Sequence, residues 1–214
     1  MLYMFFADGF EEVEAIATLD VIRRGGIEIK SVGVGSEIVK GSHNISVKCD
    51  TTIDNIVYDN NISGIILPGG MPGTTNLMNN SLVDSFIDKC YQNKKLICAI
   101  CAAPMILGRK GLLKGREAVC FPGFEDELDG AIISSDYVCN SDGIITAKGM
   151  GSAINFGLEI VAELLDKETS EKLKSTLQCS WETKKTQGIF TLKSETIFLT
   201  PKKMNLTELF LLDL

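Results

Sequence analysis

The chain has 214 residues, of which 45% are hydrophobic and 23% are charged, a balance that predicts a folded globular protein rather than a disordered one. The net charge of -7 argues against a nucleic-acid-binding surface, which needs clustered Lys and Arg. The sequence contains no run of ~18 apolar residues, so no membrane span is expected. The opening MLYMFFADGFEE lacks the features of a signal peptide, and seven cysteines fit reduced thiols, so a cytoplasmic protein is expected.

Short apolar runs alternate with longer stretches of helical period, which predicts βαβ units and a parallel sheet. A β-hairpin is expected between residues 36 and 54, where polar and apolar residues alternate around a turn. The expected fold is a doubly wound, mostly parallel α/β sheet sandwiched by helices. The strands are expected at residues 2–7, 27–34, 63–68, 95–100, 117–121 and 143–147, and the helices at residues 11–24, 81–93, 102–111, 152–165 and 168–177.

The last segment of the chain differs in character from the rest. From residue 179 the sequence reads as a strand pair followed by an apolar end, and it does not continue the βα alternation. We therefore expect a domain over residues 1–178 and a C-terminal extension without catalytic function over residues 179–214.

The segment LICAICAAPM, residues 96–105, carries two cysteines. Cys98 falls within the expected strand and is interpreted as a core residue. Cys101 falls where the strand turns into the next helix, whose first turn suits Pro104, and such turns hold the ligand sites of doubly wound sheets. The adjacent helix N-terminus predicts a lowered pKa for the Cys101 thiol. A C-x-x-C redox pair and two buried cysteines without chemistry remain as alternative readings.

Two further segments are expected to follow strands at the same edge of the sheet as Cys101. DGFEEVEA, residues 8–15, brings Glu11, Glu12 and Glu14 there, although a helical wheel does not decide which way Glu14 faces. LPGGMPG, residues 67–73, carries Gly69 and Gly70, whose backbone N–H groups can approach a substrate oxygen.

These segments occur in an order and spacing that resemble the ThiJ/PfpI superfamily, most closely its parkinsonism-associated deglycase branch and the bacterial ThiJ-like proteins. The resemblance covers roughly residues 1–178 and includes DGFEEVEAIATLDVIRRGGI, ILPGGMPGTTNL, ICAICAAPMIL, CFPGFED and TAKGMGSAINFGLEIV. It implies a flavodoxin-like fold shared with class I glutamine amidotransferases, and a homodimer.

By this resemblance, Cys101 is the reactive elbow cysteine, Glu14 the acid that contacts it, and the backbone N–H groups of Gly70 and Ala102 the oxyanion site. Two neighbouring anions repel, so a thiolate at Cys101 implies a protonated Glu14 that donates a hydrogen bond to the sulfur. Phe121 stands where animal members carry a histidine. The resemblance places His43, in the expected hairpin, near the active site of a dimer partner, whereas a lone histidine is more often a surface residue.

Several activities of proteins with a similar fold need residues that this sequence lacks. No histidine follows residue 43, which argues against amidotransferase and cysteine-protease activity. The sequence shows neither a dinucleotide fingerprint nor a metal cluster, so no cofactor is expected. Two hypotheses remain. One is a glyoxalase or deglycase that acts on a small aldehyde, such as methylglyoxal, or on its adduct with an amine. The other is an oxidative-stress sensor or chaperone-like protein, without catalytic activity, that is regulated by oxidation of Cys101.

Overall fold

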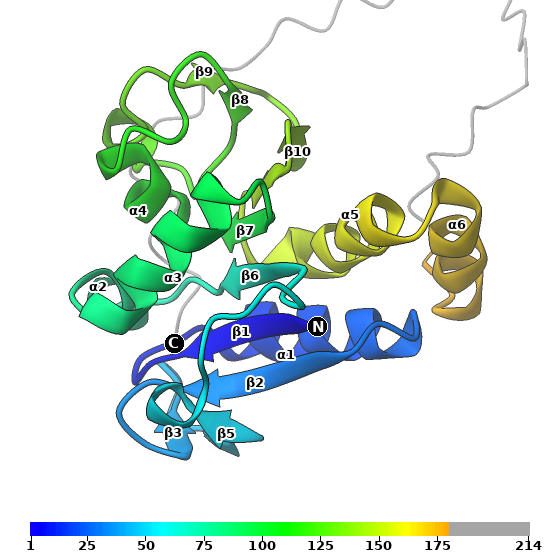
Figure 1. The fold of residues 1–214 in the computed structure, drawn as a ribbon. Coiled ribbons are helices and arrows are strands. Elements are labelled where there is room, and N and C mark those ends of the chain that lie inside the picture. Colours follow the sequence, from blue (N-terminus) through cyan, green and yellow to red (C-terminus); the bar gives the residue numbers. More distant parts are fainter. Residues whose placement is uncertain (180–214) are drawn as a thin grey trace, which may run out of the picture. The chain divides into compact units, whose positions relative to one another are not determined.

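The computed structural model describes residues 1–179 (Figure 1). The expected C-terminal extension over residues 179–214 lies, apart from its first residue, outside the described residues. Among these residues, no helix combines the length and the apolar character needed to cross a membrane.

A central sheet of seven strands forms the middle layer of the described part of the chain. The strand order is β10-β11-β7-β6-β1-β2-β5, and only the β10–β11 pair is antiparallel. The five longer parallel strands, β2-β1-β6-β7-β11, follow the 2-1-3-4-5 order of flavodoxin-like folds, which confirms the predicted fold class. The strand bounds are Leu2–Phe6 (β1), Ile29–Gly33 (β2), Thr51–Thr52 (β5), Gly64–Leu67 (β6), Leu96–Ile100 (β7), Val138–Ser141 (β10) and Ile144–Ala147 (β11).

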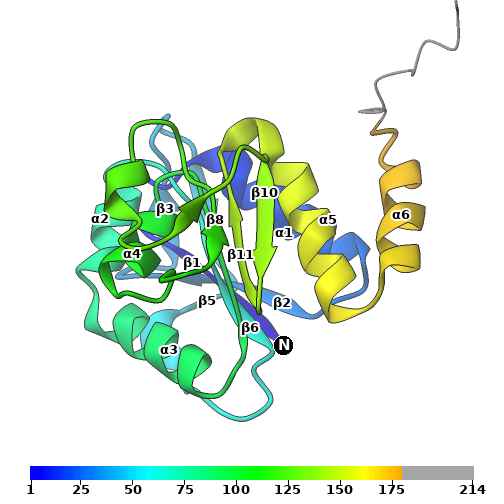
Figure 2. The ribbon, with the colours of Figure 1, turned by 90° about the horizontal axis from the view of Figure 1, so that it is seen from above.

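Helices cover both faces of the sheet, because alternate side chains of each buried strand point to opposite faces (Figure 2). Met4 of β1 packs in one core with α1 and α5, whereas Phe5 packs in the other core with α3 and α4. Helix α6 packs on α5 through Leu173. The helix bounds are Glu12–Arg24 (α1), Gly73–Met78 (α2), Ser81–Gln92 (α3), Pro104–Arg109 (α4), Ala153–Leu164 (α5) and Lys167–Thr176 (α6).

Side-chain caps explain where three of the helices begin. Glu11 accepts a hydrogen bond of 2.6 Å from the N–H of Glu14 and so caps α1. Asn80 caps α3, and Asp166 caps α6 by accepting from the N–H of Thr169 at 2.7 Å. Each cap satisfies a backbone N–H that has no partner within the helix. The first cap also fixes the turn that carries Glu14 into the interior.

The smaller elements include the expected hairpin and one correction. Strands β3 (Ile38–Lys40) and β4 (Ser46–Lys48) form the antiparallel hairpin. The segment 117–121 was expected to join the central sheet, but only Glu117–Ala118 (β8) is a strand, and it pairs with Ile132–Ile133 (β9). The reason is that the next residue, Val119, donates its N–H to the Thr146 side chain and not to a strand backbone. Three 3-10 helices span Ile53–Asn55, Glu125–Glu127 and Met150–Ser152.

Candidate active site

Cys101 lies on a sharp turn between β7 and α4, as the sequence predicts. Its backbone has a φ of 65°, in the left-handed region. Two hydrogen bonds hold this conformation: the Cys101 N–H donates to the Ala147 carbonyl at 2.9 Å, and the Cys101 carbonyl accepts from the Phe121 N–H at 2.8 Å. The side chain is half-buried, so the thiol is presented at the carboxyl edge of the sheet.

Glu14 points into the interior from the first turn of α1, with 1% of its surface exposed. Its carboxyl group lies beside the Cys101 thiol, close enough to shift the thiol pKa, and accepts a hydrogen bond of 3.1 Å from the Gly69 N–H. The structure therefore settles the facing that the helical wheel left open, and it brings together two residues that are far apart in the sequence.

Gly69 allows this contact because it has no side chain. A Cβ atom at this position would lie 2.5 Å from the Cys101 Cβ and 2.5 Å from Glu14 Oε2, closer than real Cβ atoms approach other atoms. The next residue, Gly70, adopts a φ of 89°. Its N–H group and that of Ala102 lie beside the Cys101 sulfur and act to lower the pKa of the thiol. The predicted oxyanion donors thus lie beside the predicted nucleophile, and backbone donors of this kind stabilise a negative charge on sulfur or on an adjacent oxygen.

The charge state of the pair differs from the sequence-based expectation. Burial raises the pKa of Glu14 from 4.5 to about 7, against the opposing effect of its contact with Cys101. Burial, followed by the Glu14 charge, raises the pKa of the Cys101 thiol to about 12. The expected lowering of this pKa is therefore wrong when Glu14 is ionised. The argument from the helix N-terminus omitted burial and the neighbouring carboxylate, which outweigh the backbone donors.

These two pKa values describe a pair that holds one proton and one negative charge over a broad pH range. The charge can reside on the Glu14 carboxylate beside a neutral thiol, or on the Cys101 sulfur beside a neutral carboxylic acid. Moving the proton from sulfur to carboxylate keeps a single negative charge on the pair, so no two anions face each other, and leaves the thiolate beside the N–H groups of Gly70 and Ala102. The same carboxyl group can then return the proton to a reacting atom.

A shallow depression with a volume of about 290 Å³ opens beside this pair. Phe121, Met150 and Tyr137 line it, and Lys148 Nζ lies 5.0 Å from the centroid of the Tyr137 ring. Gly149 connects the depression to the pair, because a Cβ atom there would lie 3.3 Å from the Phe121 ring and 3.6 Å from Glu14 Oε1. Phe121 therefore occupies the mouth of the site, where it supplies an apolar wall and no ionisable group.

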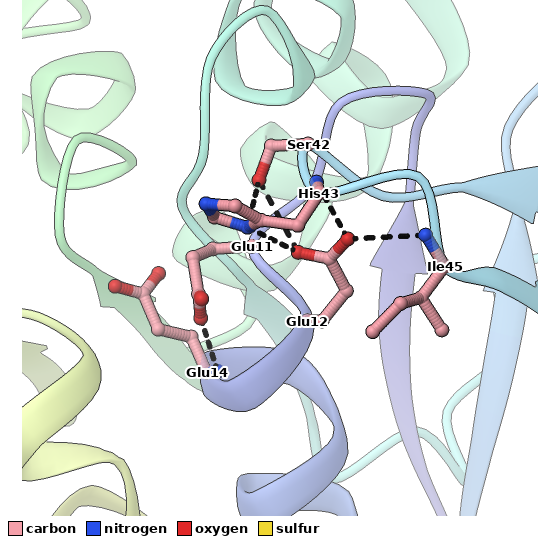
Figure 3. Close-up of polar contacts among 6 residues, drawn as sticks. All are labelled: Glu11, Glu12, Glu14, Ser42, His43 and Ile45. Atoms are coloured by element: carbon pink, nitrogen blue, oxygen red, sulfur yellow. Dashed lines mark hydrogen bonds and ion pairs between the residues drawn. The ribbon is translucent and has the colours of Figure 1, made fainter. Parts of the chain in front are cut away.

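His43 does not reach the Cys101 pair of its own chain but binds Glu12 (Figure 3). Its Nδ1 lies 2.9 Å from Glu12 Oε2, and its N–H donates to Glu12 Oε1 at 2.7 Å. Ser42 and Ile45 donate to the same carboxylate. Burial opposes ionisation of Glu12, yet these hydrogen bonds lower its pKa to about 2. The His43 pKa is raised by its hydrogen bond to Glu12, so the hairpin is held to the start of α1 by an ion pair.

Glu11, Glu12 and His43 also form a grouping that the sequence analysis did not find. One potential ligand atom from each residue lies within 4.8 Å of the others. The hairpin brings His43 to the acids from 31 residues away, a separation that no local spacing pattern reveals. These residues could hold a cation, although the oxygens of Glu12 are already occupied by the hairpin donors.

The first cysteine of the CAIC segment, Cys98, lies in the core. Cys98 has 0% of its surface exposed, and burial raises its pKa well above the ordinary value. A thiol in this environment has neither the access nor the thiolate character that a C-x-x-C redox pair requires. The half-buried Cys101 likewise differs from a residue that only fills the core.

Comparisons with known proteins show which proteins this chain resembles. The model of the DJ-1/PfpI family matches residues 1–163. The Glutathione-independent glyoxalase DJR-1.2 of Caenorhabditis elegans is 34% identical over 170 residues, which are 78% of this chain and 88% of that protein. Protein DJ-1 homolog B of Arabidopsis thaliana is 33% identical over 174 residues, which are 80% of this chain but 40% of the relative, so this chain spans less than half of that protein's length.

A solved structure extends the similarity to three dimensions. The structure described as "Toxoplasma gondii DJ-1, oxidized" superposes with a TM-score of 0.78 at 33% sequence identity, and the match covers 84% of this chain and 98% of that chain. The family match, the sequence identities and the shared fold all cover the part of the chain that carries the Cys101 pair. This chain belongs to the DJ-1/PfpI family.

Proposed function

We propose that the protein converts small reactive dicarbonyl compounds such as methylglyoxal to hydroxy acids without a cofactor, using Cys101 as nucleophile and Glu14 as proton carrier. Adducts of the same aldehyde with amines are a second class of substrate for this site. The observation that carries the proposal is the buried Glu14 carboxyl group, which lies directly beside the half-buried Cys101 thiol. The name of the Caenorhabditis elegans relative, a glutathione-independent glyoxalase, supports the reaction class.

The first step forms a carbon–sulfur bond. The Cys101 proton moves to Glu14, and the thiolate adds to the aldehyde carbon of methylglyoxal. The negative charge that develops on the carbonyl oxygen faces the N–H groups of Gly70 and Ala102. Glu14 donates its proton to this oxygen, which yields a neutral hemithioacetal and leaves Glu14 as a carboxylate.

The second stage moves hydrogen within the bound substrate. The Glu14 carboxylate removes the proton from the carbon bonded to sulfur, and the electron pair shifts to the ketone oxygen, which gives an enediolate. Glu14 returns this proton to the former ketone carbon, and the hydroxyl proton moves from the first oxygen to the second, which gives a lactoyl thioester on Cys101. Water then cleaves the carbon–sulfur bond, which releases lactate and restores the thiol. The sum is methylglyoxal plus water to lactate and a proton, with no external oxidant or reductant.

Lactate production from methylglyoxal tests this proposal. We expect turnover in the parent and none above background in Cys101→Ser. Because general acid–base groups contribute ~10²–10⁴-fold, Glu14→Gln should retain less than about 1% of the parental rate. Cys179→Ser is the matched control, since Cys179 is also half-buried but lies outside the site. Equal lactate production in the parent and in Cys101→Ser would refute the proposal.

The second candidate is a sensor in which Cys101 is oxidised. The half-buried sulfur, the two backbone N–H donors and Glu14 would also stabilise a sulfinate. One Toxoplasma gondii homologue is described as oxidized. In this case two equivalents of hydrogen peroxide are reduced to water as the thiol becomes a sulfinic acid. Mass spectrometry after peroxide treatment should then show two added oxygen atoms on Cys101, and the parent should form no lactate from methylglyoxal.

The assembly we propose is a homodimer through α1 and the β3–β4 hairpin. Val13 and Ile16 on α1, and Ile38 and Ile45 on the hairpin, are exposed apolar side chains, and the Ile45 N–H also donates to Glu12. Burial of these side chains against a second copy would also bring His43 toward the partner's site. Light scattering should give twice the chain mass for the parent and a smaller mass for Ile45→Glu. A parent that remains monomeric at micromolar concentration would refute both the dimer and a role for His43 in a partner's site.

A further inference from the structure

A second concave site lies at the edge of the sheet opposite Cys101. A cavity of about 540 Å³ opens where α3 ends, where β7 begins and where β10 turns into β11. Lys95 lines it and directly precedes β7, whereas Cys101 directly follows that strand. A strand of five residues at ~3.3 Å per residue separates the two sites by roughly 16 Å. The cavity is therefore distinct from the Cys101 pair.

The charge of this cavity is opposite to that of the whole chain. Lys94, Lys95 and Arg116 line it together with a single acid, Asp142, so the lining carries a net charge of +2. The whole chain carries -7. A concentration of positive charge in a concave surface attracts anions more strongly than the same charges spread over a convex one.

Arg116 is held in a fixed position at the wall. Its side chain is 21% exposed, and its Nη1 donates to the carbonyl oxygens of Ser141 at 3.0 Å and Asp142 at 3.4 Å. The Asp142 carboxylate lies 3.1 Å from the same nitrogen. Within residues 1–179, Nε and Nη2 of this guanidinium have no hydrogen-bond partner. Two donors of a pre-oriented arginine match two oxygens of a phosphate or carboxylate group.

The two lysines of the lining differ in how firmly their side chains are held in place. Lys95 Nζ donates to the Asn60 carbonyl at 3.2 Å, which anchors it beside the start of β7. Lys94 is exposed, has a φ of 52°, and forms no ion pair with the described residues. Tyr91, 43% exposed, adds an aromatic ring to the same lining. The cavity thus offers two anchored cations, one adjustable cation and one flat apolar face.

We propose that this cavity binds a small organic phosphate monoester, with the phosphate on Arg116 and Lys94 and the organic part against Tyr91. A phosphate monoester carries about -1.5 to -2 charge at pH 7, which balances the +2 of the lining, whereas a monocarboxylate does not. The volume of about 540 Å³ lies within the ~300–1,000 Å³ typical of small-molecule sites and suits a ligand the size of a mononucleotide.

Isothermal titration calorimetry with adenosine monophosphate tests the proposal on the full chain. We expect saturable binding with a Kd below about 1 mM that weakens as salt is raised. Lys94→Gln should weaken binding by about fivefold or more, and Arg116→Gln by more than about tenfold. Because Arg116 also holds the β10–β11 turn, the exposed Lys94 provides a test that does not depend on that turn. Lys167→Gln, on α6 and outside the cavity, is the matched control and should bind like the parent.

Two further probes identify the ligand class. Inorganic phosphate should bind more weakly than adenosine monophosphate, because it lacks the part that contacts Tyr91. Succinate, a dianion of two carboxylates, should also bind more weakly. The proposal fails if adenosine monophosphate shows no saturable binding up to about 10 mM, a range that covers weak complexes, or if Lys94→Gln binds it as the parent does. Tighter binding of succinate than of adenosine monophosphate would refute the phosphate assignment.

Discussion

Glu14 should make the folded protein less stable as the pH rises, and Glu14→Gln should remove that effect. In the folded state burial raises the pKa of Glu14 from 4.5 to about 7, and the side chain is 1% exposed, so solvent screens this effect little. An unfolded chain restores the ordinary value. The folded state therefore holds the Glu14 proton at pH values where the unfolded state has released it.

The size of the effect follows from the same shift. A rise from 4.5 to about 7 corresponds to about 3 kcal/mol at ~1.36 kcal/mol per pH unit. Below pH 4.5 both states are protonated and the full stability is present. As the pH rises through 7 the folded state must also ionise Glu14, and the stability conferred by its proton is lost. A glutamine cannot ionise, so the variant should gain up to about 3 kcal/mol relative to the parent between pH 4.5 and 8.

Urea unfolding at pH 5 and pH 8 measures this difference. We expect the free energy of unfolding of Glu14→Gln, minus that of the parent, to increase with pH, whatever its sign at pH 5. Glu28→Gln serves as the control, because Glu28 is exposed and its substitution should leave the difference nearly independent of pH. A Glu14→Gln difference that is equal at the two pH values would show that the buried carboxyl group does not have the raised pKa on which the mechanism depends.

Three further outcomes are expected. Iodoacetamide should alkylate Cys101 at a lower pH midpoint in Glu14→Gln than in the parent, because the carboxylate charge that raises the thiol pKa is gone; equal midpoints would contradict this coupling. Gly69→Ala should lower stability by about 1–3 kcal/mol in thermal unfolding and separate the pair, whereas Gly151→Ala, which meets no atom within 4 Å, should not; similar losses in both would rule out the clash. A chain truncated after Gln178 should unfold cooperatively and keep the reactivity of Cys101; loss of either would place residues 179–214 in the core.

The fold was largely predictable because each central strand is apolar on both sides. The strands around Met4 and Ile66 read as continuous apolar runs in sequence, and both residues are fully buried. Segment 117–121 is apolar after Glu117, but composition does not specify which backbone a strand pairs with. Strand β10 was not predicted. It lies at the edge of the sheet, and Asn140 and the turn that follows interrupt its short apolar pattern.

The residues expected at the candidate site lie close together in the structure, but their electrostatics could not be predicted from the sequence. The strand-to-helix boundary located Cys101, and the resemblance added Glu14, Gly70 and Ala102, all of which the structure brings together. Sequence could not supply the burial of Glu14, because that depends on the whole packing of α1 on the sheet. It also could not locate His43, whose contact with Glu12 depends on the docking of the hairpin.

The left-handed turn at Cys101 has a consequence for how the sequence can change. Glycine adopts a φ of 65° without strain, whereas a residue with a Cβ atom loses about 1 kcal/mol or more there. Selection for folding alone would therefore favour replacement of Cys101 by glycine, a change that abolishes the thiol. Variants selected in the laboratory only for thermal stability are expected to lose this cysteine early. Retention of Cys101 in such variants would indicate selection for the function of its thiol.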